Sequence, residues 1–135
     1  MPRKYNLSIT YEPKIEGVRN GTIRQTIRTG RRFQVGDLVS FHGWQGKPYR
    51  SPWSWRTPYF ELTEVYRIVA YPEHVLAPGG GALPPWPALD TTELVDLARL
   101  DGIEPPTKEA LFQVLGSMHD LSGGVGMQII RWGVV

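Results

Sequence analysis

The segment GTIRQTIRTGRRFQVGDLV concentrates cationic side chains on one predicted strand and in the turn after it. Its first part, TIRQTIRT, alternates strictly, which is typical of a β-strand and places Arg24, Thr26 and Arg28 on one face. Arg31 and Arg32 follow in the turn. Guanidinium groups pair well with phosphate. We therefore expect Thr26 and Arg28 to line a pocket for a nucleobase or nucleotide, with Arg31 and Arg32 on its rim.

A second set of candidate binding residues lies in the insertion FHGWQGKPYRSPWSWRTPYF, where aromatic and cationic residues alternate. Aromatic rings stack on unpaired bases and neighbouring cations bind the phosphates. An alternative is that PWSWRTPYF folds over the end of the sheet and buries its own tryptophans. The candidate nucleic-acid-binding residues from both segments are Gln25, Arg28, Arg31, Arg32, Trp44, Lys47, Arg50, Trp53, Trp55 and Arg56.

The charge of the chain is divided between its two halves, although the net charge is only +2. Residues 19–60 hold eight Lys or Arg and one acid, Asp37, whereas residues 61–135 hold four basic and ten acidic residues. A cationic half with few counter-charges attracts polyanions such as RNA or another single-stranded nucleic acid. The alternative is that the two halves neutralise each other across the fold.

Several kinds of chemistry are not expected. The chain has no cysteine, which excludes a disulfide, a thiolate metal site and a cysteine nucleophile. Its three histidines have no paired spacing, so we predict neither a metal nor a cofactor. The glycine run GGGAL lacks the context of a phosphate-binding loop. With neither a membrane-length apolar run nor a signal-peptide stretch, we expect a cytoplasmic protein without a membrane partner.

The elements that must position these residues are predicted from their periodicity and capping signals. Strands are expected in YNLSITYE, TIRQTIRT, DLVSFHGW, YFELTEVYRIVAY and MQIIRWGVV, and a short helix in PKIEGVRNG. TTELVDLARLDG and PTKEALFQVLGSMHD are expected to form two consecutive helices. The sequence predicts one α+β domain over residues 1–135, a small β-barrel with two helices before the closing strand. An aromatic-rich insertion at about 43–60, expected to be a long loop or a wide hairpin, and a Gly/Pro-rich loop at about 77–89 interrupt it.

These features together resemble the ASCH family, a branch of the PUA-like β-barrels. The resemblance rests on GTIRQTIR followed by VGD, on the paired helices around the D-G step of LARLDGIEPPTKEALFQVL, and on the closing strand MQIIRW. It covers about residues 7–132. The order and spacing of the motifs carry it more than any single motif does. It implies a PUA-like barrel associated with RNA binding and nucleotide-directed chemistry.

One branch of that family resembles an amidohydrolase that removes the acetyl group from N4-acetylcytidine. The resemblance implies a threonine nucleophile at Thr26 and a carboxylate at or near Asp101. The family lysine falls on Ile23, which cannot act as a base. Arg24 is close in sequence, but arginine stays protonated, so its role would be to stabilise an oxyanion or to hold a carboxylate. Thr26, Arg24 and Asp101 are therefore the candidate catalytic residues, and a threonine mechanism requires a base from elsewhere.

Three functions remain open at this point. The first is a module that binds RNA, or a modified or flipped nucleotide, in a basic pocket. The second is a hydrolase, either an amidohydrolase on a modified nucleoside or a metal-assisted ribonuclease. The third is an interaction module that uses the Trp-rich loop against a protein partner.

Overall fold

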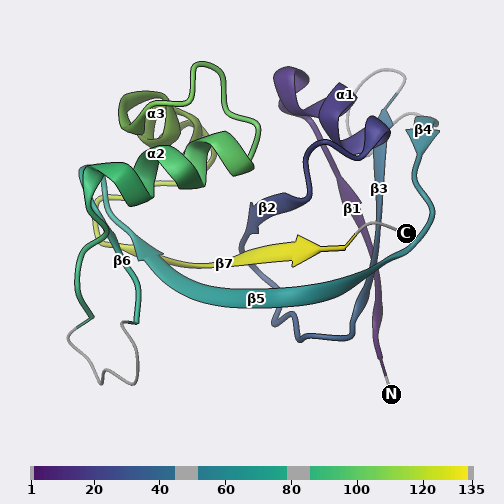
Figure 1. Ribbon diagram of the computed structural model, residues 1–135, viewed down its shortest axis with the longest axis horizontal. Helices are drawn as coiled ribbons and strands as arrows, with labels where there is room; N and C mark the ends of the chain where they lie inside the picture. Colours follow the sequence, from purple (N-terminus) through teal and green to yellow (C-terminus); the bar gives the residue numbers. More distant parts are fainter. Residues whose placement is uncertain (1, 45–51, 79–85, 134–135) are drawn as a thin grey trace.

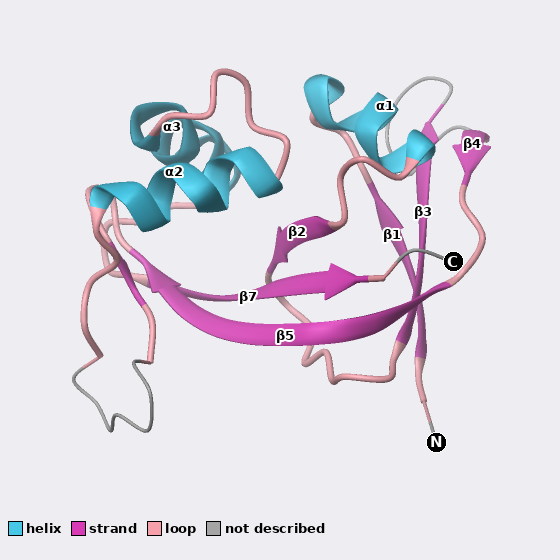
Figure 2. Ribbon diagram, viewed as in Figure 1, coloured by secondary structure: helices cyan, strands magenta, loops and turns pink. Residues whose placement is uncertain are grey.

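The computed structural model describes residues 2–44, 52–78 and 86–133. Lys47 and Arg50 lie outside these residues. The strands are β1 (Lys4–Ser8), β2 (Gln25–Arg28), β3 (Leu38–Trp44), β4 (Trp53–Arg56), β5 (Phe60–Ala70), β6 (Val75–Leu76) and β7 (Val125–Trp132). The helices are α1 (Glu12–Asn20), α2 (Thr91–Leu100) and α3 (Lys108–Met118). The predicted α+β class and the two consecutive helices before the last strand are confirmed (Figures 1 and 2).

The strands form one continuous path in the order β1-β3-β5-β7-β2, with β4 added to β3 and β6 to β5. β1 runs parallel to β3, and the other pairs are antiparallel. β5 is the long curved strand in Figure 1: its first residues pair with β3 and the remainder with β7. Among the described residues the path is open between β1 and β2. The Arg28 side chain links these two strands by donating to the Ser8 carbonyl, with an Nη2–O distance of 2.6 Å.

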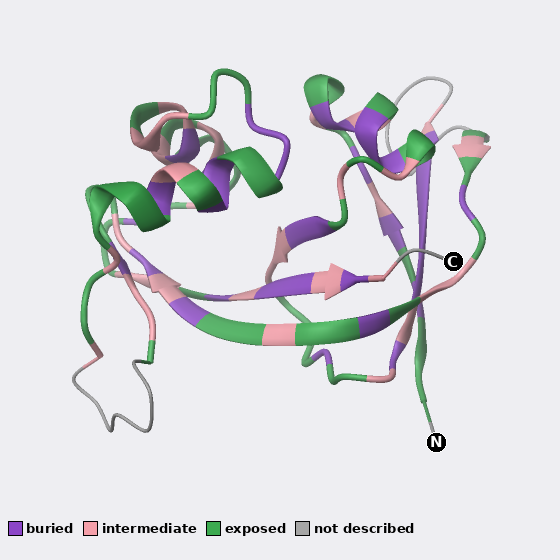
Figure 3. Cartoon of the chain, in the orientation of Figure 1, coloured by how far each residue is buried: buried purple, intermediate pink, exposed green. Residues whose placement is uncertain are grey.

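Two apolar clusters stabilise this arrangement. α2 and α3 pack on β5, β6 and β7 through residues that include Leu97, Leu111 and Ile68. α1 packs with β1 and β3 in a second cluster that includes Val18 and Phe41. Figure 3 shows β3 buried along most of its length, and Figure 1 shows β2 between the two groups of helices. β2 therefore lies where residues from α1 and from the end of α2 approach each other.

Local signals explain where the helices begin and end. Pro13 lies in the first turn of α1, and Gly21 ends that helix with φ +84°. The Asp90 and Glu93 side chains each accept a hydrogen bond from the other residue's backbone N–H at the start of α2. Thr107 caps α3 by accepting from the Ala110 N–H. The predicted helix boundaries are confirmed.

The insertion before residue 60 contains a strand antiparallel to β3, as the wide-hairpin alternative predicts. Trp53–Arg56 form β4, which pairs with β3 and has a register shift at Gly43/Trp44. A Cβ at Gly43 would collide with the Trp55 indole, so the absence of a side chain there lets Trp55 lie across β3. Trp55 is half-buried and packs on the cluster around Phe41. Pairing with β3 thus outweighs the weak strand propensity of this Pro- and Ser-containing stretch.

Candidate active site

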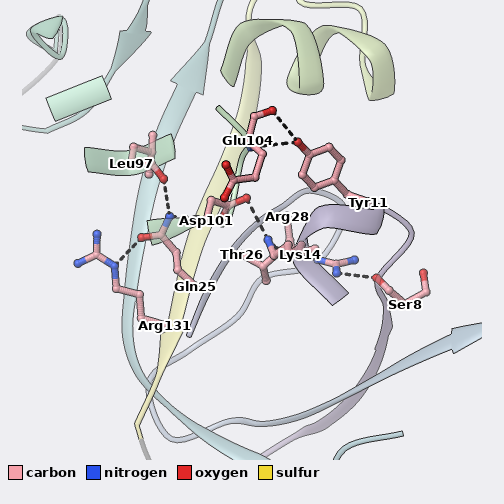
Figure 4. Close-up of polar contacts among 10 residues, drawn as sticks. All are labelled: Ser8, Tyr11, Lys14, Gln25, Thr26, Arg28, Leu97, Asp101, Glu104 and Arg131. Carbon is pink, nitrogen blue, oxygen red and sulfur yellow. Dashed lines mark hydrogen bonds and ion pairs between the residues drawn. The ribbon is translucent and has the colours of Figure 1, made fainter. Parts of the chain in front are cut away.

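Thr26 lies on β2, opposite Ile130 of β7, and only 3% of it is exposed. Its hydroxyl oxygen accepts two hydrogen bonds from cationic groups. Lys14 Nζ lies 2.9 Å from Thr26 Oγ1, and Arg28 Nε lies 3.3 Å from it (Figure 4). A hydroxyl oxygen that accepts from two cations is stabilised in its anionic form. These two donors can therefore stabilise the Thr26 oxygen as it gains negative charge.

The lysine comes from α1. Lys14, Gly17 and Val18 form the inward face of this helix, at the i, i+3, i+4 spacing of neighbours on one side. The Lys14 ammonium is therefore buried beside β2, with 5% of the residue exposed. Sequence reasoning did not identify Lys14. The sequence does contain a signal for it. Lys14 lies three residues before Gly17 and four before Val18, so all three share the face of a short helix that must pack on the core.

Asp101 completes the cluster from the end of α2. Its Oδ2 lies 2.9 Å from Lys14 Nζ, and its Oδ1 accepts from Gln25 Nε2 at 3.3 Å. Gly102 ends the helix with φ +77°, and a Cβ there would collide with Ile23 Cδ1. The tight turn at Gly102 thus fixes the backbone from which the Asp101 carboxylate reaches Lys14. The predicted carboxylate and threonine lie in one buried cluster with Lys14.

Burial determines the protonation of this cluster. Removal from water lowers the pKa of Lys14 from its ordinary value; the charge and hydrogen bond of Asp101 oppose this effect, and Arg28 adds to it. Burial likewise raises the pKa of Asp101, which Lys14, Gln25 and Arg28 oppose.

Two residues near Thr26 in the sequence lie outside the cluster. Ile23, the position of the family lysine, is half-buried and packs on the apolar cluster around Val18. Arg24 precedes β2, is exposed, and donates from Nε to the Gly21 carbonyl at 2.9 Å. The alternation of TIRQTIRT predicts that Arg24 and Thr26 share a strand. This prediction is wrong, because β2 begins at Gln25.

The predicted rim residues follow β2. Arg31 and Arg32 are both exposed, and the Arg31 guanidinium lies 5.2 Å from the centre of the Tyr5 ring. The Arg31 carbonyl accepts from Gln128 Nε2. Arg32 lines a cavity of about 290 Å³ with Arg67 and Trp86. Among the described residues, Arg28 is the predicted arginine that donates a hydrogen bond to Thr26.

The aromatic candidates gather at a different place, under α1. Trp44, Trp55 and Arg19 line a cavity of about 410 Å³, with the Arg19 guanidinium 5.7 Å from the centre of the Trp55 ring. Arg56 instead donates to Ser40 and Asn6. Trp53 lies on β4. The structure thus separates the buried Thr26 cluster from the cavity that Trp44 and Trp55 line, and it places Arg24, Arg31, Arg32 and Arg56 in neither.

No protein-family model, curated protein or solved structure matches this chain. No helix among the described residues is long and apolar enough to cross a membrane. The side-chain geometry is therefore the main basis for assigning a function.

Proposed function

We propose that this chain is an ASCH-type, PUA-like domain that hydrolyses an N-acyl amide on a nucleoside, with Thr26 as nucleophile and Lys14 as its base. The observation that carries the proposal is the 2.9 Å separation of Lys14 Nζ and Thr26 Oγ1, with Asp101 on the other side of the ammonium. Lysine activates a hydroxyl only when it is desolvated and neutral. Burial lowers the pKa of Lys14, which is the direction that this requirement needs. Lys14 thereby takes the role that the family assigns to the position of Ile23.

The reaction follows from these contacts. Neutral Lys14 Nζ takes the hydroxyl proton while Thr26 Oγ1 bonds to the acyl carbon, and the carbonyl electrons move onto oxygen. Arg28, which already donates toward Thr26, is the nearest described cation to stabilise that oxyanion. The amine then leaves with the proton from Lys14, and the acyl group remains on Thr26 as an ester. Water attacks the ester, Lys14 takes its proton, and collapse releases the acid and restores the threonine hydroxyl.

A substrate must reach a hydroxyl that is nearly covered. Tyr11, just before α1, contacts Glu104 in the connection from α2 to α3 (Figure 4). The Glu104 N–H donates to Tyr11 Oη at 3.2 Å, and Tyr11 Oη donates to the Glu104 carbonyl at 3.5 Å. Glu104 is exposed, so these bonds can exchange with water at modest cost. Parting Tyr11 from Glu104 is the entry step in this proposal.

The test is the release of cytidine from N4-acetylcytidine, followed by chromatography. The proposal predicts turnover by the wild-type chain and a loss of about 100-fold or more in Lys14→Met. Lys108→Met, a lysine at the start of α3, serves as the matched control and is expected to retain full activity. Equal rates for Lys14→Met and wild type would reject Lys14 as the base. A folded wild-type chain without activity on N4-acetylcytidine or other N-acylated nucleosides would reject the hydrolase.

A second candidate function is binding of single-stranded RNA, and the aromatic cavity of Trp44, Trp55 and Arg19 favours it. Stacking of a base contributes roughly 1–3 kcal/mol, and phosphate contacts make affinity fall with salt. Fluorescence anisotropy with labelled RNA should therefore show salt-dependent binding that Trp55→Ala weakens about tenfold or more. Trp86→Ala removes a tryptophan that does not line this cavity and serves as the control. Unchanged affinity in folded Trp55→Ala would exclude this binding site.

A further inference from the structure

A chain of hydrogen bonds connects the candidate active site to β7. Arg131 Nε donates to Gln25 Oε1 at 2.8 Å, and Gln25 Nε2 donates to Asp101 Oδ1 at 3.3 Å and to the Leu97 carbonyl at 3.2 Å. Gln25 is 1% exposed and lies opposite Arg131 in the β2–β7 pairing. The Arg131 guanidinium also pairs with Glu64, with Nη1 3.2 Å from Oε2.

The partners on the two sides of Gln25 fix the orientation of its amide. An arginine can only donate, so the amide oxygen must face Arg131. The Leu97 carbonyl and the Asp101 carboxylate can both accept, so the NH₂ group must face them. A reversed amide would place NH₂ against a guanidinium and oxygen against a carbonyl and a carboxylate. All the hydrogen-bonding groups of this buried side chain are therefore used in one orientation.

This orientation controls the Asp101 carboxylate. Gln25 holds Oδ1, and Lys14 holds Oδ2 at 2.9 Å. Without Gln25, the carboxylate would be free to rotate away from Lys14, because the buried Oδ1 would have lost its donor. We propose that Gln25, held by Arg131, is a positioning residue that keeps the Asp101 carboxylate aligned on Lys14 and hence Lys14 aligned on Thr26. Its effect on turnover rests on the hydrolase proposed above, whereas its effect on Asp101 does not.

The direct readout is the titration of Asp101. The charged and titratable groups facing this carboxylate are Lys14 from α1 and Arg28 from β2, with Arg131 of β7 one residue further along the chain of hydrogen bonds. A donor to the ionised carboxylate favours that form, so its loss raises the pKa of Asp101. The chain contains five aspartates. ¹³C-labelled aspartate side chains can therefore be followed by NMR across pH, with Asp101→Asn identifying the resonance.

The test compares two variants that break the chain of hydrogen bonds with two that keep a cationic donor to Gln25. Gln25→Met removes the amide without changing charge, and Arg131→Met releases the amide from its anchor at a partly exposed position. Both should raise the pKa of Asp101, and both should lower kcat on N4-acetylcytidine by roughly 10- to 100-fold, the cost of a misplaced catalytic group. Arg131→Lys keeps a cationic donor and should restore both values. Glu64→Gln removes only the outer ion pair and should change neither.

An unchanged Asp101 titration in folded Gln25→Met and Arg131→Met would overturn the positioning role, whatever happens to activity. If Gln25→Met fails to fold, Arg131→Met and Arg131→Lys still decide the question. A shifted Asp101 titration in a chain whose wild-type form has no hydrolase activity would support the positioning role and reject the proposed function. The two proposals therefore fail independently.

Discussion

Lys14 of α1 and Thr26 of β2 are 12 residues apart in the sequence, and the Lys14 ammonium donates a 2.9 Å hydrogen bond to the Thr26 hydroxyl. The same ammonium forms an ion pair with Asp101, 87 residues further along the chain than Lys14. A lysine that contacted only Asp101 would be one partner of a structural ion pair. The first contact is the one that makes it a candidate base, and the predictions below separate the two roles.

The ion pair between Lys14 and Asp101 predicts a particular pattern of stability. Lys14→Met leaves a buried carboxylate without its cation, and the expected loss in the free energy of unfolding is about 3–5 kcal/mol. The double variant Lys14→Met/Asp101→Leu removes both charges and should recover most of that loss. Urea denaturation measures both. A double variant less stable than Lys14→Met would contradict this account of the pair.

The pH dependence of stability follows from the direction of the Lys14 shift. Its pKa in the folded chain lies below the ordinary value of 10.5, so in the interval between the two the unfolded chain binds more protons. Stability should therefore rise with pH across that interval, and the contribution of Lys14 should disappear as pH falls through its folded-state pKa. Denaturation midpoints measured for wild type and Lys14→Met should show this rise only in wild type. Parallel curves would mean that the pKa of Lys14 is not lowered.

Catalytic activity should depend on the same protonation of Lys14. Because only the neutral amine can accept the Thr26 proton, kcat/KM should increase with pH until Lys14 is deprotonated and then level off. The ascending limb should lie below pH 10.5. Initial rates on N4-acetylcytidine, corrected for its uncatalysed hydrolysis, measure the profile. A rate that falls with increasing pH over this interval would be inconsistent with a lysine base.

Tyr11→Phe tests the entry step. The change removes the Tyr11 hydroxyl that bonds to both backbone groups of Glu104 and leaves the ring in place. A hydrogen bond of this kind contributes about 1 kcal/mol, so easier opening should increase kcat/KM by roughly fivefold at most. Stopped-flow and steady-state rates on the same substrate measure the change. A large decrease would instead assign the hydroxyl a direct part in the reaction.

Gly43→Ala tests the packing of Trp55 against β3. The added methyl group would collide with the indole ring, so Trp55 should be displaced from β3 and stability should fall by about 1–3 kcal/mol. Intrinsic tryptophan fluorescence should shift to longer wavelength as the indole becomes more exposed. Gly116→Ala, in α3 with open space around it, should instead stabilise the chain by about 0.5–1 kcal/mol. An unchanged emission spectrum in Gly43→Ala would show that Trp55 keeps its place.

Local signals in the sequence predict much of the fold. The boundaries of α2 and α3 follow from Asp90, Gly102 and Thr107, and the long strand predicted in YFELTEVYRIVAY corresponds to β5. For the insertion that contains β4 the sequence leaves a long loop and a wide hairpin open, because its Pro, Gly and Ser residues are typical of turns. Pairing with β3, which is a tertiary contact, decides for a strand at Trp53–Arg56.

The candidate site is harder to predict, because its members come from three separate elements. Resemblance to a family places Thr26 and Asp101, which the structure brings together. It also points to Ile23 for the lysine, whereas the lysine that contacts Thr26 is Lys14 of α1. Lys14 is close to Thr26 only because α1 folds back over β2, with Gly17 packed against Ile23. Helical spacing shows that Lys14 lies on the same face of α1 as Gly17 and Val18. It does not show which element packs against that face.

The most direct test of the central claim is the rate of N4-acetylcytidine hydrolysis by Thr26→Val and Thr26→Ser, measured at the same pH and with thermal melting as the check on folding. Valine preserves the shape of the buried side chain and removes Oγ1, whereas serine keeps the hydroxyl and loses only a methyl group. The account predicts a loss of about 1,000-fold or more for Thr26→Val and a loss within about tenfold for Thr26→Ser. Comparable activity in Thr26→Val and wild type would contradict a threonine nucleophile.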